Sequence, residues 1–361
     1  SIEIEQPPSD SKETDVKTDE PERQPPAPGE LPDDGDKTPP PEHSEEEERQ
    51  SAQLAVVNPA ALSTNLTPST IKQLLPYADE STGALLYQYP ITIPSGRNGL
   101  QPSVSLSYNN QQTDDASIVG HGWSLSIPSI ERLNKTGSDE LYNSDYFSSS
   151  LSGELIALSA STFGSKTDNG EFLEYTFTSD VWTVRDKQGT LYTFGATAAS
   201  RQDNPNDSSQ VYRWMLSEIR DRNDNFVSYS YDKVGGQIYP SAIIYTGHGT
   251  TPGIFEVTFL RESRPDATQS YKPAFLVAID DRVSEIQTKV NGVLVRSYTL
   301  GYGTGDNGAR SLLTSITETG YDEAGTPISL PAVTIAYQTT APGWSSDATW
   351  ESPVGFALQN S

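Results

Sequence analysis

Residues 83–109 have the sequence GALLYQYPITIPSGRNGLQPSVSLSYN, and residues 120–130 have the sequence GHGWSLSIPSI. From Ser103 to Tyr108, serines alternate with apolar residues, and this period of two places the apolar side chains on one face of a β-sheet. The preceding segment 94–99 is a turn signal, because proline fixes φ and Asn98-Gly99 tolerates positive φ. The stretch therefore predicts strand, tight turn, strand, loop and strand, the opening of a large β-structure. It contains no evident reacting group.

The same alternation continues through the rest of the chain. Further strands are predicted at 171–177, 227–231, 255–259, 294–300 and 333–337, with a hairpin at 181–195 and one more strand within 210–221. No long amphipathic helix is evident, although residues 67–75 are compatible with one or two helical turns that Pro76 would end. Short strands separated by Gly, Asn and Asp predict an all-β fold, a large antiparallel sheet of many hairpins.

Overall composition excludes several classes of function. The 361 residues include 49 acidic and 24 basic side chains, a net charge of −25, which argues against a nucleic-acid or anionic-membrane partner. The absence of cysteine excludes disulfides and thiolate chemistry. A helix needs about 20 apolar residues to span a bilayer, and no apolar run in the sequence approaches that length. No signal peptide is evident. The chain begins at Ser1, so we expect a processed protein or an excerpt of a longer one.

Four segments are expected along the chain. Residues 1–50 hold 17 acidic and 5 basic residues with 10 prolines and no aromatic residue, so 1–51 is predicted to be a disordered acidic tail. The tail is interpreted as a solvated spacer, with an interaction tail or tether as the alternative. We expect a linker at 52–82, a β domain at 83–340, and a linker at 341–361 that leads toward a downstream domain.

No constellation of residues predicts catalysis, a cofactor or a metal. His43, His121 and His248 are isolated in sequence, and the latter two are expected in turns. Residues 221–225 imitate the start of a calcium loop, but Phe226 occupies the position where glycine is required. The phosphate-binding, dinucleotide-binding, zinc-protease and serine-hydrolase motifs are absent from the sequence. We therefore predict a protein that is not an enzyme.

Several motifs resemble the entry to the N-terminal domain of the SpvB/TcB family. That family contains SpvB and the B subunits of insecticidal toxin complexes. The resemblance is carried by residues 89–91, 94–102, 106–109 and 120–125, and it resumes at 297–302, 311–316 and 330–337. Residues 221–235, and more weakly 186–195, also resemble the tyrosine-aspartate (YD) repeat of RHS proteins, although Asp224 occupies a position where those repeats usually carry glycine.

The resemblance implies a structural and delivery role. The domain would form part of a β shell that encloses or presents a toxic C-terminal region, with other toxin-complex subunits or a downstream RHS-repeat region as partners. It also implies a secreted bacterial protein, cytoplasmic before export. The ADP-ribosyltransferase activity of SpvB belongs to a separate domain with a Glu-x-Glu motif. The only well-separated match here, Glu3-Ile-Glu5, lies in the tail, so this activity is not carried over.

Two further expectations follow. The alternative function is a secreted or surface β-module that binds a glycan or a host protein through Trp123, Trp344 and Trp350. In addition, segments 155–158 and 274–279 are continuously apolar, which predicts strands that must be covered on both faces. A shell segment with such strands and with open sheet edges is expected to associate when it is isolated from its downstream region.

Overall fold

The structure, a computed structural model, describes residues 76–112, 117–167, 170–305 and 310–337. Across these ranges the regular elements are strands, apart from one short 3-10 turn, η1 (Ala198–Ser200), which confirms the all-β prediction. In these ranges no helix is long and apolar enough to cross a membrane. The predicted acidic tail, the helical turns at 67–75, and Trp344 and Trp350 lie outside the described residues.

The opening stretch forms a four-stranded antiparallel sheet. Its strands pair in chain order: β1 (Tyr77–Ala78), β2 (Leu85–Pro90), β3 (Ser105–Asn109) and β4 (Trp123–Leu125). Tyr89 pairs with Leu106, and Tyr108 pairs with Trp123. Both Asn98 and Gly99 have positive φ, 52° and 79°, as the turn signal predicted. The first strand, β1, precedes the predicted domain start at Gly83.

A closed barrel follows. Its strands are β5 (Ser129–Arg132), β6 (Phe147–Ser149), β7 (Gly153–Ala157), β8 (Thr162–Ser165), β9 (Glu174–Thr178), β10 (Val181–Arg185), β11 (Leu191–Phe194) and β13 (Asp207–Arg220). Each pairs with the next in this order, and β13 pairs back with β5, so the ladder closes on itself. The short strand β12 (Arg201–Asn204) pairs with the first half of β13.

The barrel interior is packed with aromatic side chains. Trp182 and Trp214 are fully buried there, with ring centroids 6.1 Å apart at an angle of 77°. Phe147 contacts both indole rings edge to face, at 4.9 and 5.9 Å. Such offset and edge-to-face arrangements add to the stabilisation from burial, about 0.5–1.5 kcal/mol for each pair. The barrel is therefore a filled core.

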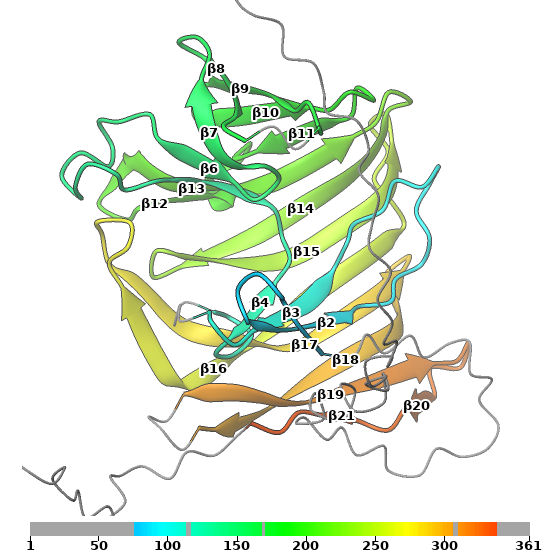
Figure 1. Cartoon of the computed structure of the whole chain (residues 1–361). Helices are drawn as coiled ribbons and strands as arrows, with labels where there is room; N and C mark the ends of the chain where they lie inside the picture. Colours follow the sequence, from blue (N-terminus) through cyan, green and yellow to red (C-terminus); the bar gives the residue numbers. More distant parts are fainter. Residues whose placement is uncertain (1–75, 113–116, 168–169, 306–309, 338–361) are drawn as a thin grey trace, which may run out of the picture. The chain divides into compact units, whose positions relative to one another are not determined.

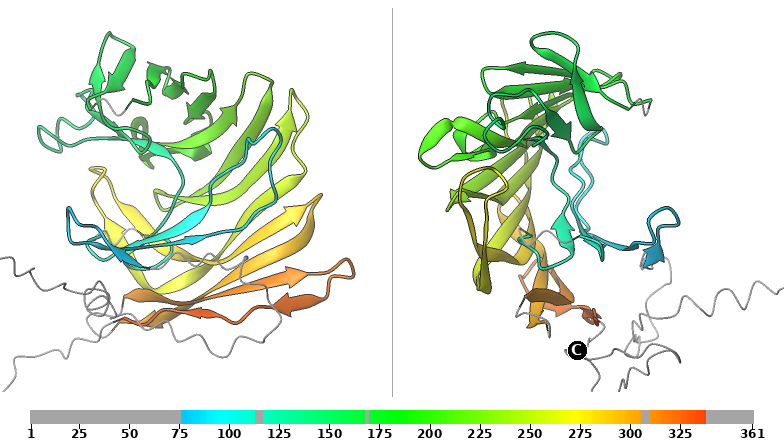
Figure 2. Two further views of the ribbon diagram at one scale, coloured as in Figure 1. Left: turned by 45° about the vertical axis from the view of Figure 1, so that its right-hand side comes forward. Right: turned by 60° about the vertical axis from the view of Figure 1, so that its left-hand side comes forward.

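A long sheet extends from the barrel. Strand β13 also pairs with β14, and from there consecutive antiparallel hairpins continue to β19, as Figures 1 and 2 show. The strands are β14 (Asn225–Val234), β15 (Gln237–His248), β16 (Phe255–Ser270), β17 (Val277–Val290), β18 (Val293–Thr304), β19 (Ser311–Tyr321), β20 (Pro327–Ser329) and β21 (Val333–Thr334). Both β20 and β21 pair with β19. The strand predicted at 333–337 is thus shorter than expected.

Two-residue turns determine the register of several hairpins. Val290 pairs with Val293 across Asn291-Gly292, whose φ angles are 51° and 79°. Two positive φ angles are what a type I′ turn requires, and this turn matches the right-handed twist of the strands. Gly235-Gly236 joins β14 to β15 in the same way.

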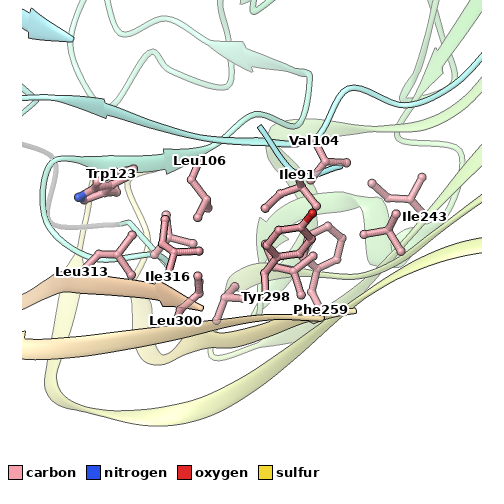
Figure 3. Close-up of a cluster of buried hydrophobic side chains, with 14 of the residues drawn as sticks. Ile91, Val104, Leu106, Trp123, Ile243, Phe259, Tyr298, Leu300, Leu313 and Ile316 are labelled. Atoms are coloured by element: carbon pink, nitrogen blue, oxygen red, sulfur yellow. The ribbon is translucent and has the colours of Figure 1, made fainter. Parts of the chain in front are cut away.

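The main core lies between the four-stranded sheet and the long sheet. Figure 3 shows Ile91, Val104, Leu106 and Trp123 facing Tyr298, Leu300, Leu313 and Ile316. The four-stranded sheet thus covers one face of the long sheet. Alternating with the buried Ile286 and Thr288, β17 carries Gln287 and Lys289 on the opposite face, neither of them buried. One covered and one polar face is the usual arrangement of antiparallel sheets.

The expectation of strands covered on both faces is wrong. In β7, Leu155 is buried in the barrel, but Ile156 and Leu158 are 44% and 68% exposed. In the second segment, Phe275, Val277 and Ile279 are buried whereas Leu276 is 41% exposed. The barrel wall and the long sheet each have one packed face here, so alternate apolar residues remain on the solvent side.

Candidate functional site

The turn at His121 and the segment 221–225, which resembles the start of a calcium loop, are both held by hydrogen bonds within the domain. The backbone N–H of His121 donates to the carbonyl of Ser311, the first residue of β19, at 2.9 Å. The Asp221 carboxylate accepts bonds from the backbone N–H groups of Asn223 and Asn225 and from the Asn225 amide. Within the part of the chain that the structure describes, no cluster of three or more His, Asp or Glu could hold a metal ion.

The Asp221 turn is one of three equivalent turns. Asp186, Asp221 and Asp322 each accept bonds from backbone N–H groups two and four residues later. In each turn the fourth residue adopts positive φ: Gly189 at 84°, Asp224 at 59° and Gly325 at 77°. The self-similarity of 186–195 and 221–235 therefore reflects a shared hairpin turn, and the third copy at Asp322 was not found from the sequence.

Trp123 is not a surface aromatic. It is 1% exposed, and its indole N–H donates to the Tyr337 hydroxyl at 2.8 Å. The Tyr337 hydroxyl donates in turn to the Leu313 carbonyl, and the Tyr87 and Tyr108 rings contact the indole at 5.9 and 5.4 Å. This burial corrects the prediction that Trp123 binds a partner, because its ring is enclosed between the two sheets. Trp344 and Trp350, outside the described residues, stay as predictions.

A buried ion pair holds the edge of the covering sheet in place. Arg264 donates to both carboxylate oxygens of Asp266 at 3.0 and 2.8 Å, and these side chains are 3% and 8% exposed. Arg264 also donates to the Ser117 carbonyl, while Asp266 accepts the backbone N–H of Ser311. Burial by itself would raise the pKa of Asp266, but the bonds from Arg264 and Ser311 hold it well below 3.8.

A second charged group joins the barrel to the long sheet. Glu131 of β5 accepts from Arg213 of β13 at 2.6 Å and from Lys272, after β16, at 3.2 Å. Burial by itself would raise the pKa of Glu131, but the two cations lower it below its ordinary value. Beside this group is a cavity of about 220 Å³ between the barrel and the sheet, lined in part by Tyr212 and Gln237.

The last described strands offer an unpaired edge. β20 and β21 run along β19, with Leu330 and Ile335 donating to the carbonyls of Glu318 and Thr314. In the residue-by-residue pairings of the described strands, β20 and β21 each pair with β19. Pro327 begins β20, and Pro331 lies between the two strands. Prolines are tolerated at sheet edges because they cannot donate to a ladder, and they shorten the surface available to another chain.

Comparison with known proteins gives the same family as the motifs. Residues 79–177 and 170–241 match the model of the family described as Salmonella virulence plasmid 65kDa B protein. Mono(ADP-ribosyl)transferase SpvB of Salmonella choleraesuis (strain SC-B67) is 25% identical over 211 residues. SpvB of Salmonella typhimurium (strain 14028s / SGSC 2262) has the same identity. The match covers 50% of this chain and 34% of each relative, so the chain matches about a third of their length.

Solved structures share the fold. The N-terminal domain of effector protein SpvB from Salmonella typhimurium strain LT2 has a TM-score of 0.56 and 19% identity, covering 65% of this chain and 99% of that one. The TcdB2-TccC3-Cdc42 crystal structure has a TM-score of 0.61 and 18% identity, covering 72% of this chain and 16% of that one. The structure of the Photorhabdus luminescens Tc holotoxin pore has a TM-score of 0.60 and 19% identity, covering 71% of this chain and 16% of that one.

Proposed function

We propose that the β domain of this chain, which resembles N-terminal domains of the SpvB/TcB family in sequence and fold, serves as a structural domain in toxin delivery. In this proposal it forms one section of a β shell that encloses or presents a toxic region. The toxic region and the remaining wall come from further sequence or from other subunits of a toxin complex. The protein acts after secretion from a bacterium.

The observation that carries this proposal is the difference between the two ends of the long sheet. At one end, β13 is shared with a closed barrel. At the other end, β20 and β21 form the last row of the described sheet, and the partner of both in the described pairings is β19. A wall that is closed at one end and open at the other can be extended by strand pairing in one direction only. A stiff scaffold of this kind needs no reacting group.

The enzymatic activity in the relatives' name is assigned, in our proposal, to sequence outside the matched region. The match covers 34% of SpvB, and the N-terminal domain structure of SpvB is covered almost completely by this fold. The chain would therefore act without catalysis. Pure protein incubated with NAD should show no NAD hydrolysis and no ADP-ribosyl transfer. Activity that survives purification to homogeneity would contradict this part of the proposal.

The shell role can be tested with engineered thiols, because the chain has no cysteine. Ser329→Cys places one thiol on edge strand β20, and Lys187→Cys places another in the exposed turn between β10 and β11. Maleimide should label both in the chain of residues 1–361. In a protein extended by the further wall that the proposal requires, Ser329→Cys should become protected while Lys187→Cys stays reactive. Equal labelling of Ser329→Cys in both proteins would show that the edge is not extended and would contradict the proposal.

The alternative, a surface module that binds through aromatic residues, has lost one of its three candidate residues. Trp123 is occupied by contacts between the two sheets.

A further inference from the structure

A cavity of about 560 Å³ lies between two loops that are far apart in sequence. One is the loop of residues 94–100, between β2 and β3, and the other joins β15 to β16. The hydroxyl of Tyr245 donates to the Pro94 carbonyl at 2.8 Å and so fastens the first loop to the long sheet. In Figure 1 the first loop follows β2 and reaches the ends of the long strands. The cavity is lined by Ser95, Gly96, Arg97, Thr246, His248, Thr251, Pro252, Ile254 and Phe255.

The charge of this lining differs from that of the chain. Acidic residues outnumber basic ones 49 to 24 in the sequence, yet the lining contains Arg97 and His248 and neither Asp nor Glu. Among the described residues, no side-chain hydrogen bond or ion pair involves Arg97 or His248. Two acids near these loops already have partners: Asp224 pairs with Arg220, which also donates to the Gly249 carbonyl, and Asp221 accepts bonds from Asn223, Asn225 and the side chain of Asn98, next to Arg97. An unpaired guanidinium offers a planar set of donors that suits a carboxylate.

The wall of the cavity carries backbone strain. Thr246 has φ of 73°, a conformation that is an outlier for a β-branched residue. It is the extra residue of a bulge, because Phe226 pairs with Gly247 and Val227 pairs with Tyr245. The Thr246 hydroxyl accepts the N–H of Ile254, on the opposite side of the hairpin. Bulges redirect strands beside binding sites, and strained residues concentrate where a site needs a particular shape.

The remaining lining residues indicate which anion would fit. Ser95 and Thr251 supply hydroxyls that can both donate and accept. Phe255, whose ring contacts Tyr245 at 5.3 Å, and Pro252 supply apolar surface. Hydroxyl partners next to an apolar face and a cation suit a ring that carries both hydroxyls and a carboxylate. We propose that this cavity binds an acidic sugar, with Arg97 on the carboxylate and His248, Ser95 and Thr251 on the hydroxyls.

The proposal can be tested by titrating the chain of residues 1–361 with glucuronate, and separately with the neutral sugar glucose, in calorimetry or NMR. We expect saturable glucuronate binding with Kd in about the millimolar range, typical of so small a ligand, and much weaker binding of glucose. Arg97→Gln should weaken glucuronate binding at least about tenfold, because the charged hydrogen bonds are lost. His248→Gln should weaken it by a smaller factor.

The matched control is Arg185→Gln, which removes an exposed arginine from β10 of the barrel and should leave glucuronate binding unchanged. Arg97 lies in a loop and His248 is the last residue of β15, and both are exposed, so their variants are expected to fold, and unchanged thermal unfolding of each verifies this. Three results would overturn the proposal: no saturable binding of glucuronate, equal binding of glucose, or equal binding by Arg97→Gln. The outcome is separate from the thiol-labelling test of the shell role.

Discussion

The indole N–H of Trp123 donates to the hydroxyl of Tyr337 at 2.8 Å, across 214 residues of sequence. Trp123 begins β4 of the covering sheet, and Tyr337 follows β21 along β19. The bond therefore joins the covering sheet to the open end of the long sheet. The Tyr337 hydroxyl also donates to the Leu313 carbonyl of β19, so one hydroxyl links the indole of the covering sheet to the backbone of the long sheet.

Trp123→Phe is expected to destabilise the domain by about 2–3 kcal/mol, since it leaves a cavity and removes the hydrogen bond that the Tyr337 hydroxyl accepts. Tyr337→Phe should cost about 1–2 kcal/mol, because it removes both hydrogen bonds but keeps the ring. The double variant should cost less than the sum, as expected for residues in direct contact. Urea unfolding measures all three. Strict additivity would mean that the bond does not couple the sheets.

Asp224→Gly is expected to stabilise the domain by about 0.5–1 kcal/mol. Asp224 has φ of 59° at the position where the two equivalent turns carry Gly189 and Gly325. Left-handed conformation costs an L-residue about 1–2 kcal/mol, and the greater freedom of glycine when unfolded offsets part of that gain. The reciprocal change, Gly325→Asp, should destabilise, because a Cβ there meets no atom within 4 Å and only the backbone cost remains. Thermal unfolding measures both variants, and a shift of the unfolding temperature in the same direction for both would contradict the prediction.

Stability is expected to fall as the pH drops from about 4 toward 2, in part through Asp266. Folding lowers the pKa of this carboxyl below 3.8, so its stabilisation is present above the unfolded pKa and is lost on protonation. Asp266→Asn should be less stable by about 3–5 kcal/mol at neutral pH, because Arg264 stays buried without its counter-charge. Its stability should also change less across that acidic range.

Urea titrations at pH 5 and pH 2.5 measure the Asp266 effect. Asp232→Asn is the control, because Asp232 is half exposed in its ion pair with Arg261 and should contribute less than about 1 kcal/mol. If Asp266→Asn and the unaltered protein lost equal stability between the two pH values, the buried pair would not be the acid-sensitive group.

Replacing Pro327 and Pro331 together by threonine is expected to increase association of the isolated chain. The change restores two backbone donors beside β19 and makes the edge a longer template for pairing. At physiological salt the net charge of −25 offers limited protection, since charges are screened beyond about 8 Å. Light scattering over a concentration series measures the effect. Pro205→Thr, in the turn between β12 and β13, is the control, and equal scattering by both variants would contradict the edge argument.

The local hairpins could be predicted from the sequence because their signals are local. Alternation with period two predicted the strands that became β3, β14 and β16, and turn residues such as Asn98-Gly99 marked where the chain reverses. Residues 210–221 gave mixed signals for a physical reason. Consecutive residues of β13, Val211 and Tyr212, are buried in two different core clusters, so both faces of the strand are packed over part of its length.

Other features were decided by the tertiary structure alone. Alternation shows that one face of a strand is apolar, but it does not show what covers that face. Closure of β5–β11 with β13 into a barrel, the burial of Trp123 and the pairing of Arg264 with Asp266 depend on contacts between distant segments. The same holds for the cavity between residues 94–100 and the β15–β16 turn, whose lining comes from two distant segments that the bond from Tyr245 to Pro94 joins. The sequence determined the elements and their turns, and three-dimensional packing determined which surfaces remain available for binding.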